Sequence, residues 1–152
     1  MGTFCYIRYM SLYLHKSSAG GIVLHDGKVL VVKSRIRAST EFPKGTVEPN
    51  EPLELAAIRE VEEETGYRVK IIDDLGGSTF DFESKDNGIE YRKTVFYFLM
   101  ILADDHAPVQ NLQDGEDFET LWLTIDEAKK QLTFDDAKAI LSKAINSPKR
   151  VD

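Results

Sequence analysis

The sequence is poor in cysteine, in long apolar runs and in basic residues. Cys5 is the single cysteine among 152 residues, so an intramolecular disulfide is excluded and a reducing compartment is expected. No apolar run approaches the roughly 20 residues needed to cross a bilayer. The 26 acidic residues outnumber the 19 basic ones, and the net charge of −7 argues against general nucleic-acid binding, which normally needs a basic field. We therefore expect a cytoplasmic protein that engages no membrane and meets any phosphate with a local group of basic side chains.

The length and composition are those of an ordinary globular protein. A chain of 152 residues with 42% hydrophobic and 30% charged residues can bury a sizeable core, so we expect one domain over residues 1–152. Residues 1–15 lack the basic start of a signal peptide, and Arg8 and Ser11 interrupt their apolar residues. We predict a strand there. The sequence leaves the oligomeric state open.

The most informative stretch is the acidic segment over residues 45–67, whose pattern predicts a helix from about Pro52 to Thr65. Asn50 or Glu51 is the expected N-terminal cap. Gly66 is the expected C-terminal stop. One side of this helix is apolar and consists of Leu55, Ile58 and Val61.

Three carboxylates share the opposite side of the predicted helix. At about 100° per residue, Glu60, Glu63 and Glu64 fall within one arc of roughly 100°. Such an arc is commonly just a solvated acidic surface. Here, however, the arrangement is locally unfavourable, because Glu60 and Glu64 form a like-charge pair and two glutamates lie at the helix end that disfavours anions.

The acidic segment also lacks the basic side chains that usually balance the negative charge of a surface helix. It contains no lysine, and Arg59 is its only basic residue. The small residues Ala56 and Ala57 beside the acidic arc would let another element or a ligand come close. A cluster of hard oxygen ligands calls for Mg²⁺ or Mn²⁺, and Mg²⁺ is usually held by carboxylates together with substrate phosphates.

The spacing of the segment resembles a known signature. Gly45, five residues, Glu51, seven residues and then the run REVEEETGY fill every fixed position of the Nudix hydrolase motif. Tyr67 departs from it, because the family mostly has an aliphatic residue at that packing position. The resemblance implies a mixed α/β fold with a β-sheet sandwiched between α-helices. It also implies hydrolysis of a nucleoside diphosphate linked to another moiety.

Further runs are similar to the diadenosine tetraphosphate hydrolases within this family. They are SAGGIVL, FPKG, KTVFYFL, and the Trp122–Leu123 pair followed by an Asp-Glu-Ala helix. In that group the residue three before Pro-Lys-Gly is commonly tryptophan, whereas Thr40 stands here, which argues against base stacking by that position. Glu116 lies where related hydrolases often place an additional carboxylate at the metal.

The resemblance assigns roles residue by residue. Glu60, Glu63 and Glu64, with Glu116, are the expected metal ligands, and one of them takes the proton from water. Arg59 is expected to hold a glutamate in position, and Glu51 to support the site from the helix start. Gly45 is expected to allow a tight turn. The expected substrate contacts are Lys44, Arg35, Arg37 and Tyr97.

Two classes of function remain open at this stage. The leading one is a pyrophosphohydrolase using Mg²⁺, for which Mn²⁺ can substitute, with a dinucleoside polyphosphate as the small-molecule substrate. Another nucleoside diphosphate derivative, a capped RNA end or a diphosphoinositol phosphate are alternatives within that class. The second class is a module that senses a nucleotide without cleaving it, although the complete set of glutamates favours the enzyme.

The rest of the chain predicts strands on both sides of the acidic helix, with helices behind them. A hairpin signal at Asp26-Gly27 joins two strands. Phe96 and Phe98 are expected in the core, with Tyr91 and Tyr97 on the opposite face. Thr124 and Thr133 are the expected caps of the last two helices. The predicted strands are Ala19–Leu24, Lys28–Lys33, Tyr67–Leu75, Ser78–Phe82, Ile89–Leu102 and Leu121–Leu123, with a turn at Ser84–Gly88, a loop at Ala103–Asp117, and helices at Ile125–Gln131 and Phe134–Asn146.

Overall fold

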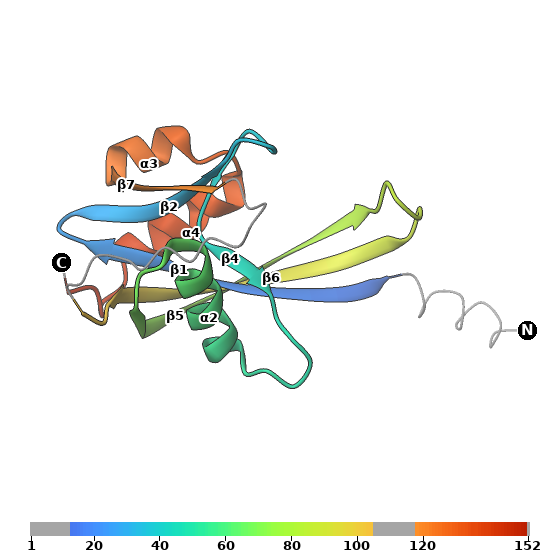
Figure 1. Ribbon diagram of the computed structural model, residues 1–152, viewed down its shortest axis with the longest axis horizontal. Helices are drawn as coiled ribbons and strands as arrows, with labels where there is room; N and C mark the ends of the chain where they lie inside the picture. Colours follow the sequence, from blue (N-terminus) through green and yellow to red (C-terminus); the bar gives the residue numbers. More distant parts are fainter. Residues whose placement is uncertain (1–12, 105–117, 152) are drawn as a thin grey trace, which may run out of the picture.

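The computed structural model describes residues 13–104 and 118–151 (Figure 1). Its elements, in chain order, are β1 (Leu14–His25), β2 (Lys28–Ser34), β3 (Ser39–Glu41), β4 (Lys44–Thr46), α2 (Leu53–Thr65), β5 (Val69–Glu83), β6 (Glu90–Leu102), β7 (Phe118–Thr124), α3 (Ile125–Gln131) and α4 (Asp135–Ile145). Outside the described residues lie Glu116, residues 105–117 of the loop predicted at Ala103–Asp117, and residues 1–12 of the strand predicted over residues 1–15. No helix in the described part of the chain is long and apolar enough to span a membrane.

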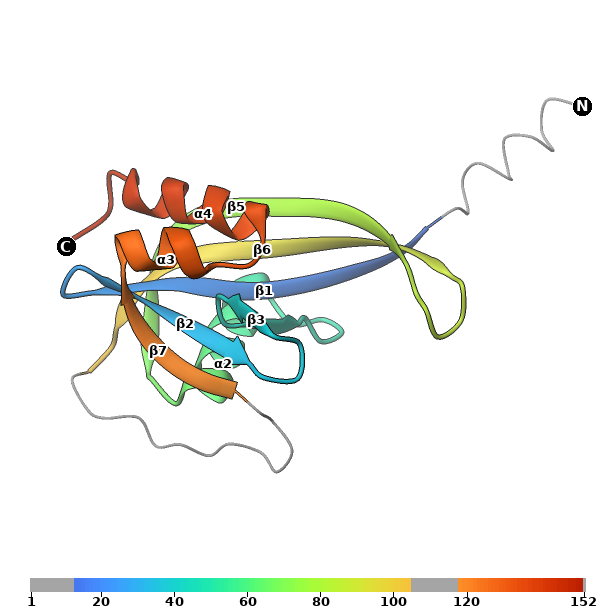
Figure 2. The same ribbon diagram turned by 90° about the horizontal axis from the view of Figure 1, so that it is seen from above.

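β1 is the centre of the strand arrangement. It runs parallel to β6 from Leu14 to Val23, whereas every other described pairing is antiparallel. The strand order is β3-β2-β1-β6-β5, with β4 added to β1 and β7 added to β2. Because β1 pairs with β2 only at its end, Leu24–His25, the β2, β3 and β7 strands turn away from β1, β6 and β5 (Figure 2). The sheet is therefore mixed, as predicted.

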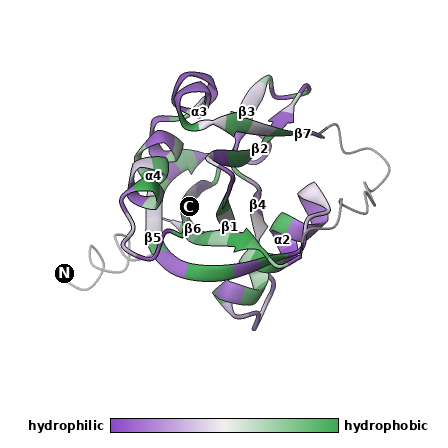
Figure 3. Cartoon of the chain, turned by 90° about the vertical axis from the view of Figure 1, so that its left-hand side faces the viewer, coloured by the Kyte–Doolittle hydropathy of each residue, from purple (hydrophilic) through white to green (hydrophobic). Residues whose placement is uncertain are grey.

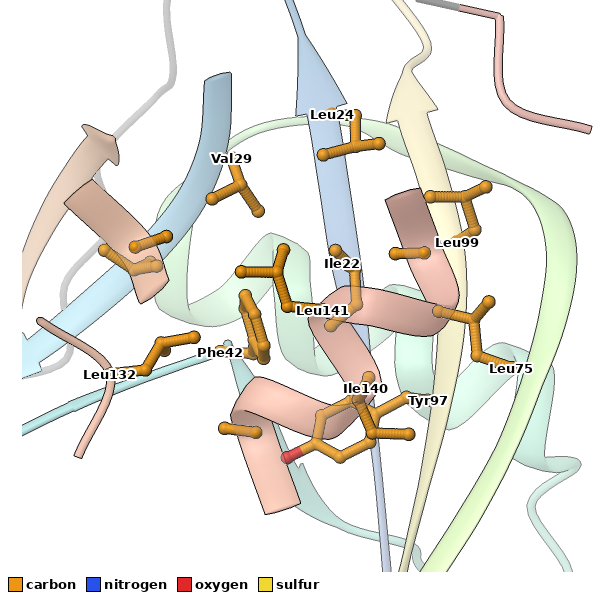
Figure 4. Packing of buried hydrophobic residues seen from close by; sticks show 14 of the residues in the cluster. Ile22, Leu24, Val29, Phe42, Leu75, Tyr97, Leu99, Leu132, Ile140 and Leu141 are labelled. Atoms are coloured by element: carbon orange, nitrogen blue, oxygen red, sulfur yellow. The ribbon is translucent and has the colours of Figure 1, made fainter. Parts of the chain in front are cut away.

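Helices cover both faces of this sheet. α2 lies on one face and α4 on the other, with α3 beside α4 over β2 and β7 (Figure 2). Alternate residues of β1 serve the two cores: Ala19 and Val23 pack with α2, whereas Ile22 packs with α4 (Figure 4). Since β1 is buried on both faces from Ser18 to Leu24, this part of it reads as a nearly continuous run of apolar and small residues. The hydrophobic stretches of β1 and β6 lie between the more hydrophilic helices in Figure 3.

Most predicted elements are confirmed. Asp26 and Gly27 both have positive φ, as the two-residue hairpin between β1 and β2 requires. The strands predicted at Tyr67–Leu75 and Ser78–Phe82 form one strand, β5, whose pairing is irregular between Asp74 and Gly77. β3 and β4 were not predicted, because strands of three residues carry too little alternation to be seen in a sequence.

Two predicted caps are wrong. Pro52 occupies the N-cap of α2 without a side-chain hydrogen bond, and neither Asn50 nor Glu51 caps it, since the Glu51 carboxylate is held by Arg59. Thr133 does not cap α4, because its hydroxyl accepts the backbone N–H of Thr40 at 2.8 Å. Thr124 does cap α3, in a capping box with Glu127.

The apolar side predicted for α2 is also wrong in part. Leu55 is 58% exposed, and the fully buried residues are Ala56, Ala57 and Val61. The helix approaches β1 so closely that its inner face admits small residues, and the larger Leu55 is left outside. The small residues beside the acidic arc thus accommodate a strand of the protein itself.

The start of β1 and the β5–β6 hairpin extend past both helices (Figures 1 and 2). We call this extension the arm, and it comprises residues 14–18, 78–83 and 90–94. Arg92 and Asp81 form an ion pair on the arm, with Nε and Oδ1 2.8 Å apart. The arm carries both exposed large hydrophobic side chains of β5, Phe80 and Phe82.

Candidate active site

The inner face of α2 lies against β4 as well as β1. A methyl group built on Gly45 of β4 would lie 2.0 Å from Oε2 of Glu60, so a side chain at this position would collide with that carboxylate. Gly45 does not have a positive φ, and the tight turn expected there is therefore wrong. A glycine is required at position 45 because α2 approaches β4 closely, so that the carboxylate of Glu60 occupies the space that a side chain would need.

Arg59 holds the segment before α2 against the helix. Its Nε and Nη2 donate to the two oxygens of Glu51 at 2.8 and 2.9 Å, and Nη2 also donates to the carbonyl oxygen of Thr46 at 3.0 Å. Its Nη1 donates to Glu60 Oε1 at 2.8 Å and lies 3.3 Å from Oε2 of Glu63. The arginine expected to position a glutamate thus contacts three of them.

The charges of this network shift one another's pKa values. The hydrogen bonds from Arg59, together with the backbone N–H of Glu48, lower the pKa of Glu51 to about 2. The carboxylates of Glu51 and Glu60 raise the pKa of Arg59. Glu51 is therefore ionised at any pH at which the protein is used, and its role is to fix Arg59.

The three glutamates of the helix occupy distinct environments. Glu60 faces inward, with a side chain 14% exposed, and burial raises its pKa although Arg59 opposes the shift. Glu63 points outward and is 51% exposed. Glu64 faces β4, where an oxygen of its carboxylate accepts the backbone N–H of Lys44 at 3.2 Å. The three carboxylates therefore form a row along the helix whose exposure to solvent increases from Glu60 to Glu63.

These residues suit a divalent cation by their chemistry. Over residues 13–104 and 118–151 no three His, Cys, Asp or Glu side chains are already arranged around a point that could hold a metal. Nη1 of Arg59 lies between Glu60 and Glu63, where it supplies positive charge to both. The carboxylate oxygens are nevertheless the hard ligands that Mg²⁺ and Mn²⁺ prefer. The donor set fits such an ion, which would share Glu60 and Glu63 with Arg59.

A pocket of about 530 Å³ opens next to β4, on the α4 side of the sheet. Lys44 links it to the carboxylates, because its backbone binds Glu64 while its side chain lines the pocket. Phe42 and Tyr97 form part of the wall, with ring centroids 6.2 Å apart and nearly perpendicular planes. The remaining lining residues are Glu41, Ser78, Phe80, Val95, Phe134, Asp135, Asp136 and Ala137. The walls are mostly apolar and aromatic, with charged groups from β3 and β4 (Glu41 and Lys44) and from the start of α4 (Asp135 and Asp136).

The predicted substrate contacts separate into two groups. Lys44 and Tyr97 both line the pocket, although Tyr97 is almost wholly buried and burial raises the pKa of its hydroxyl. Arg37 reaches the edge of the pocket through Glu41, whose Oε2 lies 3.4 Å from its Nη2. Arg35 is exposed in the turn after β2 and does not line the pocket.

Two polar residues of this region were missed in the sequence. Glu41 is buried, accepts the hydroxyl of Ser39 at 2.7 Å and lies 3.5 Å from Nζ of Lys44. Lys93 is half-buried on β6, and burial lowers its pKa, with Lys44 as the next contributor. The position of Lys93 offered a signal: it stands four residues before Tyr97 in an apolar strand, so both must face the same side.

Tyr67, the departure from the family motif, has a specific partner. Its hydroxyl accepts the indole N–H of Trp122 at 2.9 Å, and the two rings lie edge to face with centroids 5.4 Å apart. The aromatic residue at the motif's last position therefore joins the end of α2 to β7. An aliphatic residue there would leave the indole N–H without this acceptor.

Comparisons with known proteins agree with the geometry. The model of the NUDIX domain matches residues 14–143. The putative mutator protein MutT4 of Mycobacterium tuberculosis is 31% identical over an alignment of 137 residues, and the match covers 84% of this chain and 53% of that protein. The chain spans 62% and 61% of two curated relatives from Arabidopsis thaliana, so it covers about half to two thirds of such proteins.

Solved structures share the fold. The dihydroneopterin triphosphate pyrophosphohydrolase of E. coli has a TM-score of 0.70 at 21% identity, covering 88% of this chain and 99% of that one. The Ap4A hydrolase of C. elegans has a TM-score of 0.60 at 25% identity, covering 86% and 96%. Neighbours with different substrate names are thus similarly close, and the likeness does not single out one subgroup. Together with the filled motif and the domain match over most of its length, the arrangement of α2 and β4 shows that this chain belongs to the Nudix domain family.

Proposed function

We propose that this protein is a pyrophosphohydrolase that cleaves a phosphoanhydride bond of a nucleotide by attack of water, with the help of a divalent cation. The observation that carries the proposal is the position of Lys44. Its backbone N–H binds Glu64 of the carboxylate row, and its side chain lines the pocket. A nucleotide in the pocket would therefore extend its phosphates past Lys44 toward the glutamates.

Glu60, Glu63 and Glu64 would hold the cation, for which we propose Mg²⁺, with Mn²⁺ as a substitute. Nudix hydrolases generally depend on a divalent metal, which neutralises phosphoryl oxygens and makes water a better nucleophile when it is bound. Glu116 stays a predicted fourth ligand. Arg59 fixes Glu60 and Glu63 through the contacts of its Nη1, and a shift of this guanidinium would move both carboxylates.

The pocket supports a nucleoside as the organic part of the substrate. The exposed rings of Phe80 and Phe134 offer apolar surface, backed by the buried rings of Phe42 and Tyr97. Glu41 and Asp136 offer carboxylate acceptors in the same pocket. Lys44 and Lys93 would bind phosphate oxygens where the pocket meets the sheet. For the finer identity of the substrate we propose a dinucleoside polyphosphate such as diadenosine tetraphosphate, on the sequence resemblance described above. The cytoplasmic location stays a prediction.

The test is a turnover screen with Mg²⁺ over a panel of nucleotides, with products identified by mass. The panel contains diadenosine tetraphosphate, ADP-ribose, nucleoside triphosphates, a capped RNA 5′ end and a diphosphoinositol phosphate. Cleavage of a phosphoanhydride by the wild type and its loss in Glu64→Gln is the expected result. Tight binding of a nucleotide without turnover would instead identify a nucleotide-sensing module and overturn the enzyme.

A further inference from the structure

The arm carries a strip of aromatic rings on the face that continues the pocket. Phe82 and Tyr91 are direct partners across β5 and β6, and their rings stack with centroids 5.5 Å apart. The ring of Phe80 follows on the same strand, 6.1 Å from that of Phe82. Phe80 also lines the pocket. The strip therefore begins at the pocket wall and runs outward along the arm.

Two lysines border this strip at the same level of the sheet. Lys16 of β1 and Lys93 of β6 are directly opposed in the parallel register, so both side chains leave the same face. Like charges directly opposite each other destabilise a sheet. Among the described residues neither lysine has an ion-pair partner, and Nζ of Lys16 lies 4.2 Å above the ring of Tyr91. The pair presents positive charge that an anion would relieve.

The strip is open to a ligand. Phe80 and Phe82 are 42% and 36% exposed, on a strand at the edge of the sheet. Cross-strand aromatic pairs stabilise a hairpin by themselves, and this is the competing explanation for the rings. It does not account for the opposed lysines, which work against the stability of the same arm.

We propose that this strip, formed by Lys16, Phe80, Phe82 and Tyr91, binds the far end of a two-ended substrate: its additional phosphates and a second nucleobase. This rests on the proposed function, and it selects small dinucleoside polyphosphates as the substrate class. Bases stack on exposed aromatic rings whatever their identity, and lysines beside them bind the phosphates. Val95 at the pocket and Tyr91 are four steps apart along β6, a span of roughly 13 Å at 3.3 Å per residue. That distance is on the scale of a short polyphosphate chain.

The experiment compares a two-ended with a one-ended nucleotide. The dissociation constants of diadenosine tetraphosphate and ATP are measured by calorimetry in chelator, and kcat/KM of both with Mg²⁺. Phe82→Ala is expected to weaken binding of diadenosine tetraphosphate on the order of tenfold, as for the loss of one stacked base, with ATP unchanged. Lys16→Met should act in the same direction. Thr79→Ala is the matched control, because Thr79 pairs with Thr94 on the arm and lies outside the strip.

Further variants separate stacking from a structural role. Phe82→Trp should restore the preference for the two-ended nucleotide, whereas Phe82→Leu, which keeps apolar bulk, should not. An equal loss for both nucleotides in Phe82→Ala, or no loss for either, would overturn the proposal. The proposal would also be overturned if Phe82→Ala weakened the binding of an oligonucleotide with a 5′-triphosphate but left the binding of diadenosine tetraphosphate unchanged. If diadenosine tetraphosphate bound selectively through Phe82 but was not cleaved, the proposed hydrolase function would be wrong while the binding role of the strip would be supported.

Discussion

The acidic helix and the arm each bring side chains of like charge together, but they differ in how that charge is neutralised. At the acidic helix, the carboxylates of Glu60 and Glu63 on α2 and of Glu51 just before it converge on the guanidinium of Arg59. On the arm, Lys16 and Lys93 face the same side of the sheet without an ion-pair partner among the described residues. The first cluster carries a partial counterion of its own, whereas no described residue forms an ion pair with the lysines of the second. We therefore expect a cation to complete the helix and the anionic substrate to complete the arm.

Removal of one carboxylate at the helix is expected to have the largest effect. Glu64→Gln should lower kcat on the order of 10²-fold or more, since a group that acts in the transition state is lost. Excess chelator should abolish turnover of the wild type, and activity should rise toward alkaline pH because the attacking water must lose a proton. Steady-state kinetics test all three. Normal turnover by Glu64→Gln would show that the helix does not hold the reacting group.

Removal of the built-in counterion should cost stability. Arg59→Ala leaves the mostly buried carboxylate of Glu60 without its hydrogen-bond partner, and we expect a loss of about 2 kcal/mol in the free energy of unfolding. Arg59→Lys should recover little of it, because a lysine cannot make the paired contacts with Glu51. Urea unfolding measures both variants. A wild-type midpoint for Arg59→Ala would contradict the network.

On the side that meets the substrate, Lys44→Ala should act mainly through KM, on the order of tenfold, with kcat nearly unchanged. Lys44 contributes charge to the phosphates from β4, whereas the helix carries the groups that act on water. The measurement is steady-state kinetics on the best substrate of the screen. A loss of kcat at constant KM would reverse the roles assigned to the helix and the pocket.

A divalent cation should stabilise the protein through the acidic helix. Mg²⁺ or Mn²⁺ relieves repulsion among Glu60, Glu63 and Glu64 and binds the folded state only, so it should raise the melting temperature of the wild type. At a concentration 100 times the dissociation constant the gain is about 2.7 kcal/mol, and it is smaller below that. Glu63→Gln should respond much less. Equal rises in the two proteins would count against the site.

The smallest effect is expected at an ordinary surface pair that lies outside both clusters. The hydroxyl of Ser147 donates to Asp73, and together with the Asp74 backbone N–H and Lys149 it lowers the pKa of Asp73. A lowered folded-state pKa contributes stability above the usual aspartate pKa of about 3.9, and this contribution is lost as the pH falls through the folded value. Ser147→Ala should therefore be slightly less stable than the wild type at pH 7. The difference should shrink in acid, as thermal melts across this range would show.

The sequence predicts what short-range signals determine. The Asp26-Gly27 hairpin, the bounds of α2 and the long strand β6 follow from residues close in the chain. The exposed Leu55 does not, because the side that a helix buries depends on how closely its partner approaches. The role of Gly45 was misjudged for the same reason, since the group that excludes a side chain there comes from the helix.

The site divides along the same line. The motif glutamates can be found by spacing alone, and Lys44 by its place before them. Alternation along β6 could place Lys93 on the face of Tyr97, but its position opposite Lys16 depends on the register between β1 and β6. The position of Glu41 depends on the pairing of β3 with β2, which no local pattern encodes. The pocket likewise depends on residues about 90 positions apart, such as Phe42 and Phe134, that only the folded chain brings together.

The hydrogen bond between Trp122 and Tyr67 has a practical consequence. Trp122 is the chain's single tryptophan, so all indole fluorescence comes from one ring whose N–H contacts the last residue of the Nudix motif. A change in the position of the end of α2 would alter the hydrogen bond and the edge-to-face contact of that ring. Intrinsic emission can therefore report, without any label, how the acidic helix responds to a cation or a nucleotide. Tyr67→Phe, which lacks the hydroxyl that accepts the indole N–H, is the reference protein for this measurement.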